Sequence, residues 1–232
     1  MSEVQLLPIF KNNYVFLIKN EKRECIIVDP GEASAAIREI EKQHLKLKGV
    51  LITHHHADHI DGLPAIKKKF NVPVWAPEIN RSQITADYYI QDGFTVTIAG
   101  FEIKAIALPG HTLGIHAYWF EKQNWLFSGD VLFGLGCGRV FEGTYEQAYQ
   151  SLQKIKTLPE ETKIFCTHEY TKRNSEFCES LGIRSPEFTA YKTSLKVPSV
   201  PLLLSVEKKA NPFLLAEDSA VFSSLRDKRN TF

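Results

Sequence analysis

The segment THHHADHIDG (Thr53–Gly62) places four histidines and two aspartates within ten residues, directly after an apolar run. The chain has eight histidines in total, so half of them lie in this one stretch. Imidazole nitrogens and carboxylate oxygens are common metal ligands, and crowding so many titratable groups is costly without a cation. A tag remnant would instead lie at a terminus in polar surroundings. The segment therefore predicts a metal site at the end of a buried strand.

The spacing within this segment suggests two ligand sets. Residues two apart on an extended chain point the same way, so His54 and His56 can face one point while His55 faces away. Asp58 and His59 follow one turn later, at the start of a helix predicted over 58–70 (DHIDGLPAIKKKF). The segment can therefore present ligands on both sides of a shared centre.

Ligands from one loop do not complete a metal site, and three other segments offer candidates. LPGHTLG, LFSGDVLF and KIFCTHEYT place His111, Asp130 and His168 at or just after the end of an apolar strand. Together with the histidine segment, this repeated pattern predicts a site assembled from several strand ends. Asp29, which ends CIIVD, is expected either to orient a ligand histidine or to cap the following turn.

Two further histidines lack this placement. His44 lies near the end of the charged helical segment REIEKQH and is expected to face solvent. His116 lies inside a predicted strand and is expected to be a core or sheet residue. Neither is predicted to bind metal.

Composition excludes several protein classes. The formal net charge of the 232-residue chain is +1, which favours neither nucleic acid nor an acidic membrane as a partner. No run approaches the roughly 18 apolar residues of a membrane span, and the N-terminal segment lacks the pattern of a signal peptide. Four scattered cysteines without a CxxC spacing indicate reduced thiols, so we expect a cytoplasmic protein.

Hydrophobic patterning predicts a β-rich chain with interspersed helices, followed by a helical tail after Tyr170. Thr144 and Gln147 have the spacing of a helix-capping box. The arrangement suggests two sheets with helices packed outside. Segments expected as strands are Tyr14–Ile18, Cys25–Asp29, 49–54, 72–77, a pair about the AG turn at 99–100, a pair about EKQN, and 162–170.

These residues resemble the metallo-β-lactamase superfamily. Its His-x-His-x-Asp-His signature stands here as His54, His56, Asp58 and His59, and its later ligands resemble His111, Asp130 and His168. The resemblance implies an α/β (α+β) fold, namely a four-layer αββα sandwich.

Within the superfamily, the chain is most similar to the glyoxalase II family of hydroxyacylglutathione hydrolases. The matching segments are THHHADHIDG, PGHTLG, FSGDVLFGLGCGRVFEGT, THEYT, NPFL and RDKRNTF. The resemblance implies a catalytic domain over 1–168 and a small helical glutathione-binding domain over 169–232. Two departures stand out. His116 is displaced by one position from the family's Gly-His-Ile pattern, and Arg229 replaces a usual lysine.

The resemblance also implies a mechanism. One metal ion would bind His54, His56 and His111, the other Asp58, His59 and His168, and Asp130 would bridge them. The ions would be divalent, with zinc expected before iron or manganese, and a hydroxide that they share would attack the thioester of S-D-lactoylglutathione. Asp58 and Asp130 would thus be the catalytic side chains. Glutathione would contact Arg139, Tyr170, Arg226 and Arg229, and the protein would act as a monomer.

Other activities of this fold remain as alternatives. A persulfide dioxygenase uses a single iron and part of the ligand set, whereas a lactamase or lactonase would not need the arginine-bearing tail. A nuclease would carry a basic surface, and the net charge gives no support for one. A binding module without catalysis would not need a complete metal site.

Overall fold

The computed structural model describes residues 2–232, which form two compact units. Unit 1 contains the described residues up to Ala107 together with His116–Gln123, and unit 2 contains Leu108–Ile115 and Asn124–Phe232. The predicted functional division into 1–168 and 169–232 follows a different criterion and stays a prediction.

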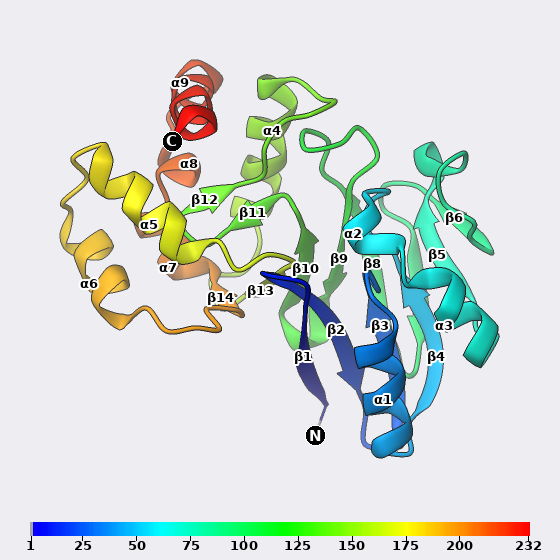
Figure 1. Cartoon of the computed structure of the whole chain (residues 1–232). Helices are drawn as coiled ribbons and strands as arrows, with labels where there is room; N and C mark the ends of the chain where they lie inside the picture. The colour runs from blue at the N-terminus through cyan, green and yellow to red at the C-terminus, as the bar shows by residue number, and fades with distance from the viewer. Residues whose placement is uncertain (1) are drawn as a thin grey trace. The chain divides into compact units, whose positions relative to one another are not determined.

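A mixed sheet with strands in the order β1 to β6 forms the centre of unit 1 (Figure 1). The first three strands pair antiparallel and the later ones parallel. On one face, alternate residues such as Val15, Leu17 and Ile27 belong to a buried cluster with α1 and α3. The bounds are β1 (Glu3–Ile9), β2 (Asn13–Lys19), β3 (Glu24–Val28), β4 (Lys46–Leu51), β5 (Val74–Pro77), β6 (Tyr88–Ile90), α1 (Ser34–Lys42) and α3 (Leu63–Phe70), with the 3-10 helix η1 (Glu78–Asn80) after β5.

A second layer of unit 1 contains β7 (Thr95–Ile98), β8 (Phe101–Ala107) and β9 (His116–Phe120), which pair antiparallel. The predicted AG turn joins β7 and β8, with both turn residues at positive φ, as a tight hairpin requires. Buried Tyr118 of β9 donates a hydrogen bond to the carbonyl of Ile52, 2.7 Å away, just after β4. The predicted EKQN turn contains the 3-10 helix η2 (Glu121–Gln123).

The predicted helix over 58–70 is interrupted. It consists of α2 (Ala57–Ile60) and α3, which begins at Leu63. The interruption lies at Gly62, whose N–H donates to the carbonyl of Pro30 at 2.9 Å. A Cβ on Gly62 would stand 2.4 Å from that oxygen, so only glycine allows this approach. The close contact holds the histidine segment against the turn that follows β3.

Unit 2 combines a short sheet, a hairpin and helices. Strands β10 and β13 pair parallel, β14 pairs antiparallel with β13, and β11 pairs with β12. Helix α4 carries the predicted capping box, in which Thr144 and Gln147 bond reciprocally. The bounds are β10 (Trp125–Gly129), β11 (Leu132–Phe133), β12 (Gly136–Cys137), β13 (Lys163–Cys166), β14 (Leu202–Leu203), α4 (Tyr145–Lys156), α5 (Thr171–Ser180), α6 (Pro186–Ser194), α7 (Leu204–Ala210), α8 (Pro212–Leu215) and α9 (Ser219–Thr231).

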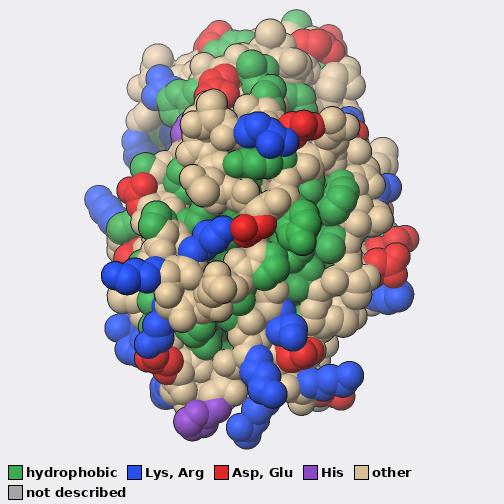
Figure 2. All heavy atoms as spheres, turned by 90° about the vertical axis from the view of Figure 1, so that its right-hand side faces the viewer, with side chains coloured by type: hydrophobic (Ala, Val, Ile, Leu, Met, Phe, Trp, Pro, Cys, Tyr) green, Lys and Arg blue, Asp and Glu red, His purple; other side chains and the backbone are tan. Residues whose placement is uncertain are grey.

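The surface of unit 1 mixes charges of both signs with apolar side chains. Figure 2 shows lysine, arginine and acidic side chains interspersed on the side that carries β6 and α3. Ile79 and Tyr88 are among the exposed large hydrophobic residues of this unit. Within residues 2–232, none of the helices combines the length and apolar composition that a membrane span needs.

Candidate metal centre

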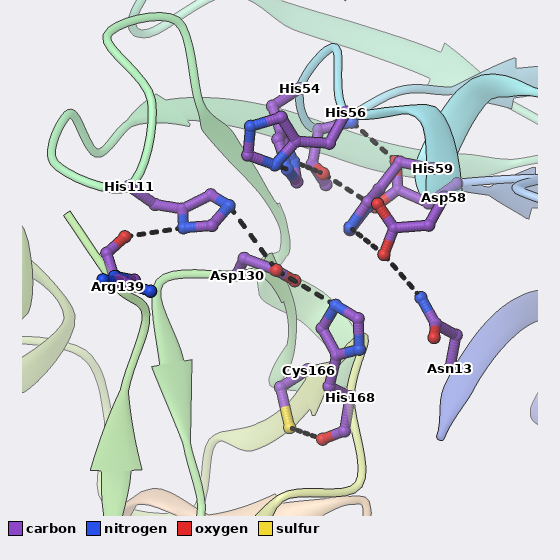
Figure 3. A network of polar contacts seen from close by, with 12 residues as sticks. Asn13, His54, His56, Asp58, His59, His111, Asp130, Arg139, Cys166 and His168 are labelled. Atoms are coloured by element: carbon purple, nitrogen blue, oxygen red, sulfur yellow. Dashed lines mark hydrogen bonds and ion pairs between the residues drawn. The ribbon is translucent and has the colours of Figure 1, made fainter. Parts of the chain in front are cut away.

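The loop after β4 brings His54 and His56 together in unit 1 (Figure 3). Nε2 of His54 lies 3.1 Å from Nδ1 of His56. Nδ1 of His54 lies 3.0 Å from the hydroxyl of Thr53, which donates its own hydrogen to Asp29. His54 therefore carries its proton on Nδ1, and its Nε2 offers a lone pair toward His56. Two ring nitrogens at this separation suit a shared cation.

The short helix α2 places Asp58 and His59 beside this pair. Nδ1 of buried His59 donates to Oδ2 of Asp29 at 2.9 Å, which leaves Nε2 as the electron-pair donor. That Nε2 lies 3.9 Å from Oδ2 of Asp58. Asn13, at the start of β2, donates from Nδ2 to the same Asp58 oxygen at 2.8 Å (Figure 3).

Asp29 is the hydrogen-bond acceptor that the residues of the unit 1 cluster share. Its carboxylate is buried and accepts hydrogen bonds from the backbone N–H and hydroxyl of Thr53, both at 2.7 Å, as well as from His59. Of its two predicted roles, the structure thus gives Asp29 the one of orienting ligand-type histidines. His55, in contrast, bonds through Nδ1 to the Asn80 amide, 2.9 Å away.

Unit 2 gathers the three later candidates around one carboxylate. Oδ2 of Asp130, just after β10, lies 3.1 Å from Nε2 of His168 and 3.5 Å from Nε2 of His111. Figure 3 shows both imidazoles directed at Asp130. All three side chains are buried. The three side chains thus converge within one unit, as the sequence pattern predicts.

The protonation of His111 tests whether this cluster fits a metal ion. Its Nδ1 lies 2.7 Å from the carbonyl oxygen of Arg139, which can only accept, so Nδ1 carries the hydrogen. Nε2 then turns a lone pair toward the Asp130 carboxylate, an arrangement that is favourable only with a proton or a cation between them. A backbone carbonyl behind a ligand histidine is a common feature of metal sites. The donor types and tautomers of both clusters fit borderline divalent ions.

The residues predicted to contact glutathione line one cavity of about 190 Å³ in unit 2. Its walls include Arg139, Tyr170, Arg226 and Arg229, together with Phe133 and Cys137. The ring of Tyr170 stacks on that of His168, with centroids 4.8 Å apart and planes within 5°. The cavity wall and a ligand-type histidine therefore share one aromatic stack.

Positive charge concentrates at this cavity. Burial lowers the pKa of Arg229, and the neighbouring charges of Arg226 and Arg173 lower it further. Guanidinium groups that repel one another favour an anionic ligand between them. Arg226 already uses one of its hydrogen-bond donors within the protein, because its Nη1 donates to the carbonyl of Cys137 at 2.8 Å.

The remaining sequence predictions about reactive groups concern the cysteines and the two outlying histidines. Cys25, Cys137, Cys166 and Cys178 are all buried free thiols. Burial raises the pKa of each, to about 12 for Cys25 and Cys178. None has the lowered pKa of a nucleophilic thiol. His44 is exposed and His116 is buried at the start of β9, as predicted.

Sequence reasoning missed Asn13, the residue that contacts Asp58. It lies at the tip of the β1–β2 hairpin, 45 positions before its partner. An asparagine at a turn is ordinary on its own. Recognition of a hairpin between Glu3–Ile9 and Asn13–Lys19 would have placed Asn13 at the turn between its strands. The hydrophobic pattern did not predict β1, so it did not predict this hairpin.

Comparison with known proteins places this geometry in context. Residues 9–168 match the model of the Metallo-beta-lactamase superfamily. The hydroxyacylglutathione hydrolase of Bdellovibrio bacteriovorus is 48% identical, over 98% of this chain and 97% of that protein. The protein of the same name from Photobacterium profundum is 39% identical, over 98% of this chain and 92% of its own. The crystal structure of BLEG-1 B3 metallo-beta-lactamase superposes with a TM-score of 0.74 at 26% identity, covering 92% of this chain and 100% of that one.

Proposed function

Because the chain belongs to the metallo-β-lactamase superfamily and has full-length relatives named hydroxyacylglutathione hydrolase, we propose that it hydrolyses S-(2-hydroxyacyl)glutathione thioesters. The products are glutathione and a 2-hydroxy acid, which is the glyoxalase II reaction. One observation carries the proposal furthest. In unit 2, the ligand-type cluster around Asp130 and the cationic cavity lie at the ends of one short hairpin, β11–β12.

The metal centre of the proposal uses all seven predicted ligands. One divalent ion would bind His54, His56 and His111, and a second would bind Asp58, His59 and His168, with Asp130 common to both. Each of the seven side chains belongs to a group of three histidine or aspartate side chains that could hold an ion. Zinc is expected first, with iron or manganese as substitutes. When bound, the ions would supply Lewis acidity that activates water at neutral pH and stabilises negative charge on the thioester oxygen.

The protein's own residues prepare this chemistry. Asp29 holds His59 in one tautomer directly and His54 through Thr53. The Arg139 carbonyl does the same for His111. These fixed tautomers leave Nε2 of His54, His59 and His111 ready as electron-pair donors, so little reorganisation of these three rings accompanies ion binding or reaction.

The cationic cavity supplies recognition of the thiol half of the substrate. Glutathione carries two carboxylates, and Arg139 and Arg229 offer charge-assisted hydrogen bonds to them. The hydroxyl of Tyr170 can bond the peptide groups. The leaving thiolate would remain close to the wall formed by Phe133 and Cys137. The preferred acyl group is D-lactoyl, so the reaction would complete methylglyoxal detoxification in the cytoplasm, catalysed by a monomer.

The test is hydrolysis of S-D-lactoylglutathione, followed by loss of thioester absorbance, for the zinc-loaded chain and for Asp130→Ala. We expect hydrolysis by the unsubstituted chain and loss of most activity in the variant, because its ions would lack their common ligand. Oxygen consumption with glutathione persulfide, without thioester hydrolysis, would favour a persulfide dioxygenase instead. Retained thioesterase activity after exhaustive metal stripping would also refute the proposal.

A further inference from the structure

The hairpin formed by β11 and β12 connects the two functional parts of unit 2. It begins just after Asp130 and ends just before Arg139, whose carbonyl accepts from His111. Its residues Phe133 and Cys137 form part of the cavity wall. The position of this hairpin therefore determines the shape of the cavity beside the ligand-type cluster.

Side-chain amides of the helical region hold the hairpin by its backbone. Nδ2 of Asn211, between α7 and α8, lies 3.1 Å from the carbonyls of both Phe133 and Gly136. Nδ2 of Asn174 on α5 donates to the carbonyl of Gly134 at 2.9 Å. Asn211 has no solvent exposure. Figure 1 shows β12 close to α8, in agreement with these contacts.

A buried acid completes the attachment. Oε2 of Glu207 on α7 accepts the backbone N–H of Leu135 at 3.0 Å and Nδ2 of Asn211 at 2.9 Å. Its Oε1 accepts the hydroxyl of Tyr191 on α6 at 2.6 Å. Leu135 has a φ of 56°, an uncommon conformation for a bulky residue. Glu207 thus bonds to the backbone at the hairpin residue that adopts a positive φ.

The glycines leave the hairpin little freedom to dock elsewhere. A Cβ on Gly136 would lie 2.3 Å from Nδ2 of Asn174. A Cβ on Gly138 would lie 1.8 Å from the backbone oxygen of Asp130. The backbone of the hairpin therefore packs directly against neighbouring atoms at these glycines, and this close packing strongly favours one position of the hairpin.

A contribution to stability does not by itself explain why a glutamate occupies the buried position 207. Its side chain is fully buried, and burial raises its pKa to about 7. An apolar residue of similar volume is often as stable as a buried charge, or more so. The bonds that Glu207 makes are instead directional, since they fix the backbone of Leu135 and the amide of Asn211.

We propose that Glu207 and Asn211 are positioning residues that fix the β11–β12 hairpin and thereby set the glutathione affinity of the adjacent cavity. The inference rests on the proposed function, since glutathione thioester is the ligand concerned. Neither residue lines the cavity, so each acts through Phe133, Cys137 and Arg139.

Three variants separate positioning from folding. Asn211→Asp keeps the oxygen that caps α8 through the N–H of Phe213, but it removes the donors to the hairpin carbonyls. Glu207→Leu removes the acceptor for Leu135 and fills the same space. Glu207→Gln retains one acceptor oxygen and serves as the conservative rescue. Ile40→Val, in the core of unit 1, is the control for a general loss of stability.

The experiment measures KM and kcat for S-D-lactoylglutathione, bound metal, and Tm for each zinc-loaded protein. We expect Asn211→Asp and Glu207→Leu to raise KM about tenfold, the effect of misplacing one charge-assisted contact, with kcat changed less than about threefold and metal retained. Glu207→Gln and Ile40→Val should keep KM within about twofold of the unsubstituted chain.

The outcomes distinguish this inference from the proposed function. An unsubstituted chain without thioesterase activity would refute the proposed function. An active chain whose Asn211→Asp and Glu207→Leu variants keep an unchanged KM would overturn the positioning role. An effect on kcat and bound metal without an effect on KM would overturn it too, as would a KM that simply follows Tm across all variants.

Discussion

The carboxylate of Asp29 accepts hydrogen bonds from both His59 Nδ1, at 2.9 Å, and the Thr53 hydroxyl, at 2.7 Å. Through Thr53 it also sets the tautomer of His54. Asp29 adopts a φ of 51°, a left-handed conformation that is uncommon for residues other than glycine. Such conformations persist where the surroundings enforce them, often at functional sites. One buried acid therefore prepares two proposed ligands.

Replacing Asp29 by asparagine should weaken metal binding. Asparagine tolerates the left-handed conformation, so the backbone is retained. Its single amide oxygen cannot replace both carboxylate oxygens, of which Oδ2 accepts from His59 and the Thr53 hydroxyl and Oδ1 accepts from the Thr53 backbone N–H. We expect metal affinity to fall by roughly 10–100-fold, as is usual for outer partners of ligand histidines. Competition with a chelator measures the change, and Asp61→Asn, an exposed neighbour, is the control. Equal affinity in Asp29→Asn and the unsubstituted chain would contradict the assigned role.

Asn13→Ala should affect one ion more than the other. Loss of the 2.8 Å bond to Asp58 frees that carboxylate to rotate, so the ion proposed to bind Asp58 and His59 should leave first. A hydrogen bond to a charged group contributes about 1.5–3 kcal/mol, which corresponds to about tenfold or more in affinity. Stepwise metal release is measured by titration with chelator, with Asn12→Ala as the matched variant. Simultaneous release of both ions at the normal chelator concentration would show that Asn13 has no such role.

Arg229→Gln should impair substrate binding rather than turnover. The substitution removes one cation from the cavity while retaining a hydrogen-bond donor. We expect KM for S-D-lactoylglutathione to rise about tenfold, with kcat changed much less. Added salt should reduce the difference in KM between Arg229→Gln and the unsubstituted chain, because salt screens the partly exposed charge of Arg229. Arg184→Gln, on the surface of the helical region, should behave like the unsubstituted chain. A normal KM in Arg229→Gln would remove this arginine from the proposed substrate site.

Glu207 should make stability depend on pH. Burial raises its pKa from 4.5 to about 7, so between these values the folded state holds a proton that the unfolded state releases. The contribution of Glu207 to the free energy of unfolding must then decrease as pH rises from about 4.5 to about 7, and stay constant above that range. Glu207→Gln cannot titrate and should lack this decrease. Urea unfolding of both proteins at several pH values measures their free energies of unfolding. If the difference between these two free energies is constant from pH 5 to pH 8, the raised pKa of Glu207 is contradicted.

Much of the candidate site was predictable because its residues follow strands. Asp130 and His168 follow β10 and β13, and because these two strands are parallel, their carboxyl ends meet at one edge of the short sheet. The histidine segment follows β4 in the same way. The predicted metallo-β-lactamase fold class and the helical C-terminal region are confirmed. They could be predicted because a dense family signature indicates which distant segments belong together, whereas hydrophobic periodicity describes each segment alone.

The unpredicted features depend on contacts between distant turns. Asn13 and Asn211 are asparagines in connecting segments, where that residue type is common for local reasons. Glu207 lies in the charged run VEKKA, which suggests a solvated helix face, yet it is fully buried. The predicted 58–70 helix is interrupted where Pro64 lies in the first turn of α3, and Gly62 there approaches Pro30, more than thirty positions away. No local pattern encodes such pairings.

The most direct test of the central claim is a metal titration of the stripped chain with S-D-lactoylglutathione as substrate. The account predicts negligible hydrolysis without metal, and activity that rises with added zinc to a plateau at about two ions per chain, the count of a dinuclear site. Full thioesterase activity in metal-free protein, or a fully loaded protein that leaves the thioester intact, would contradict it.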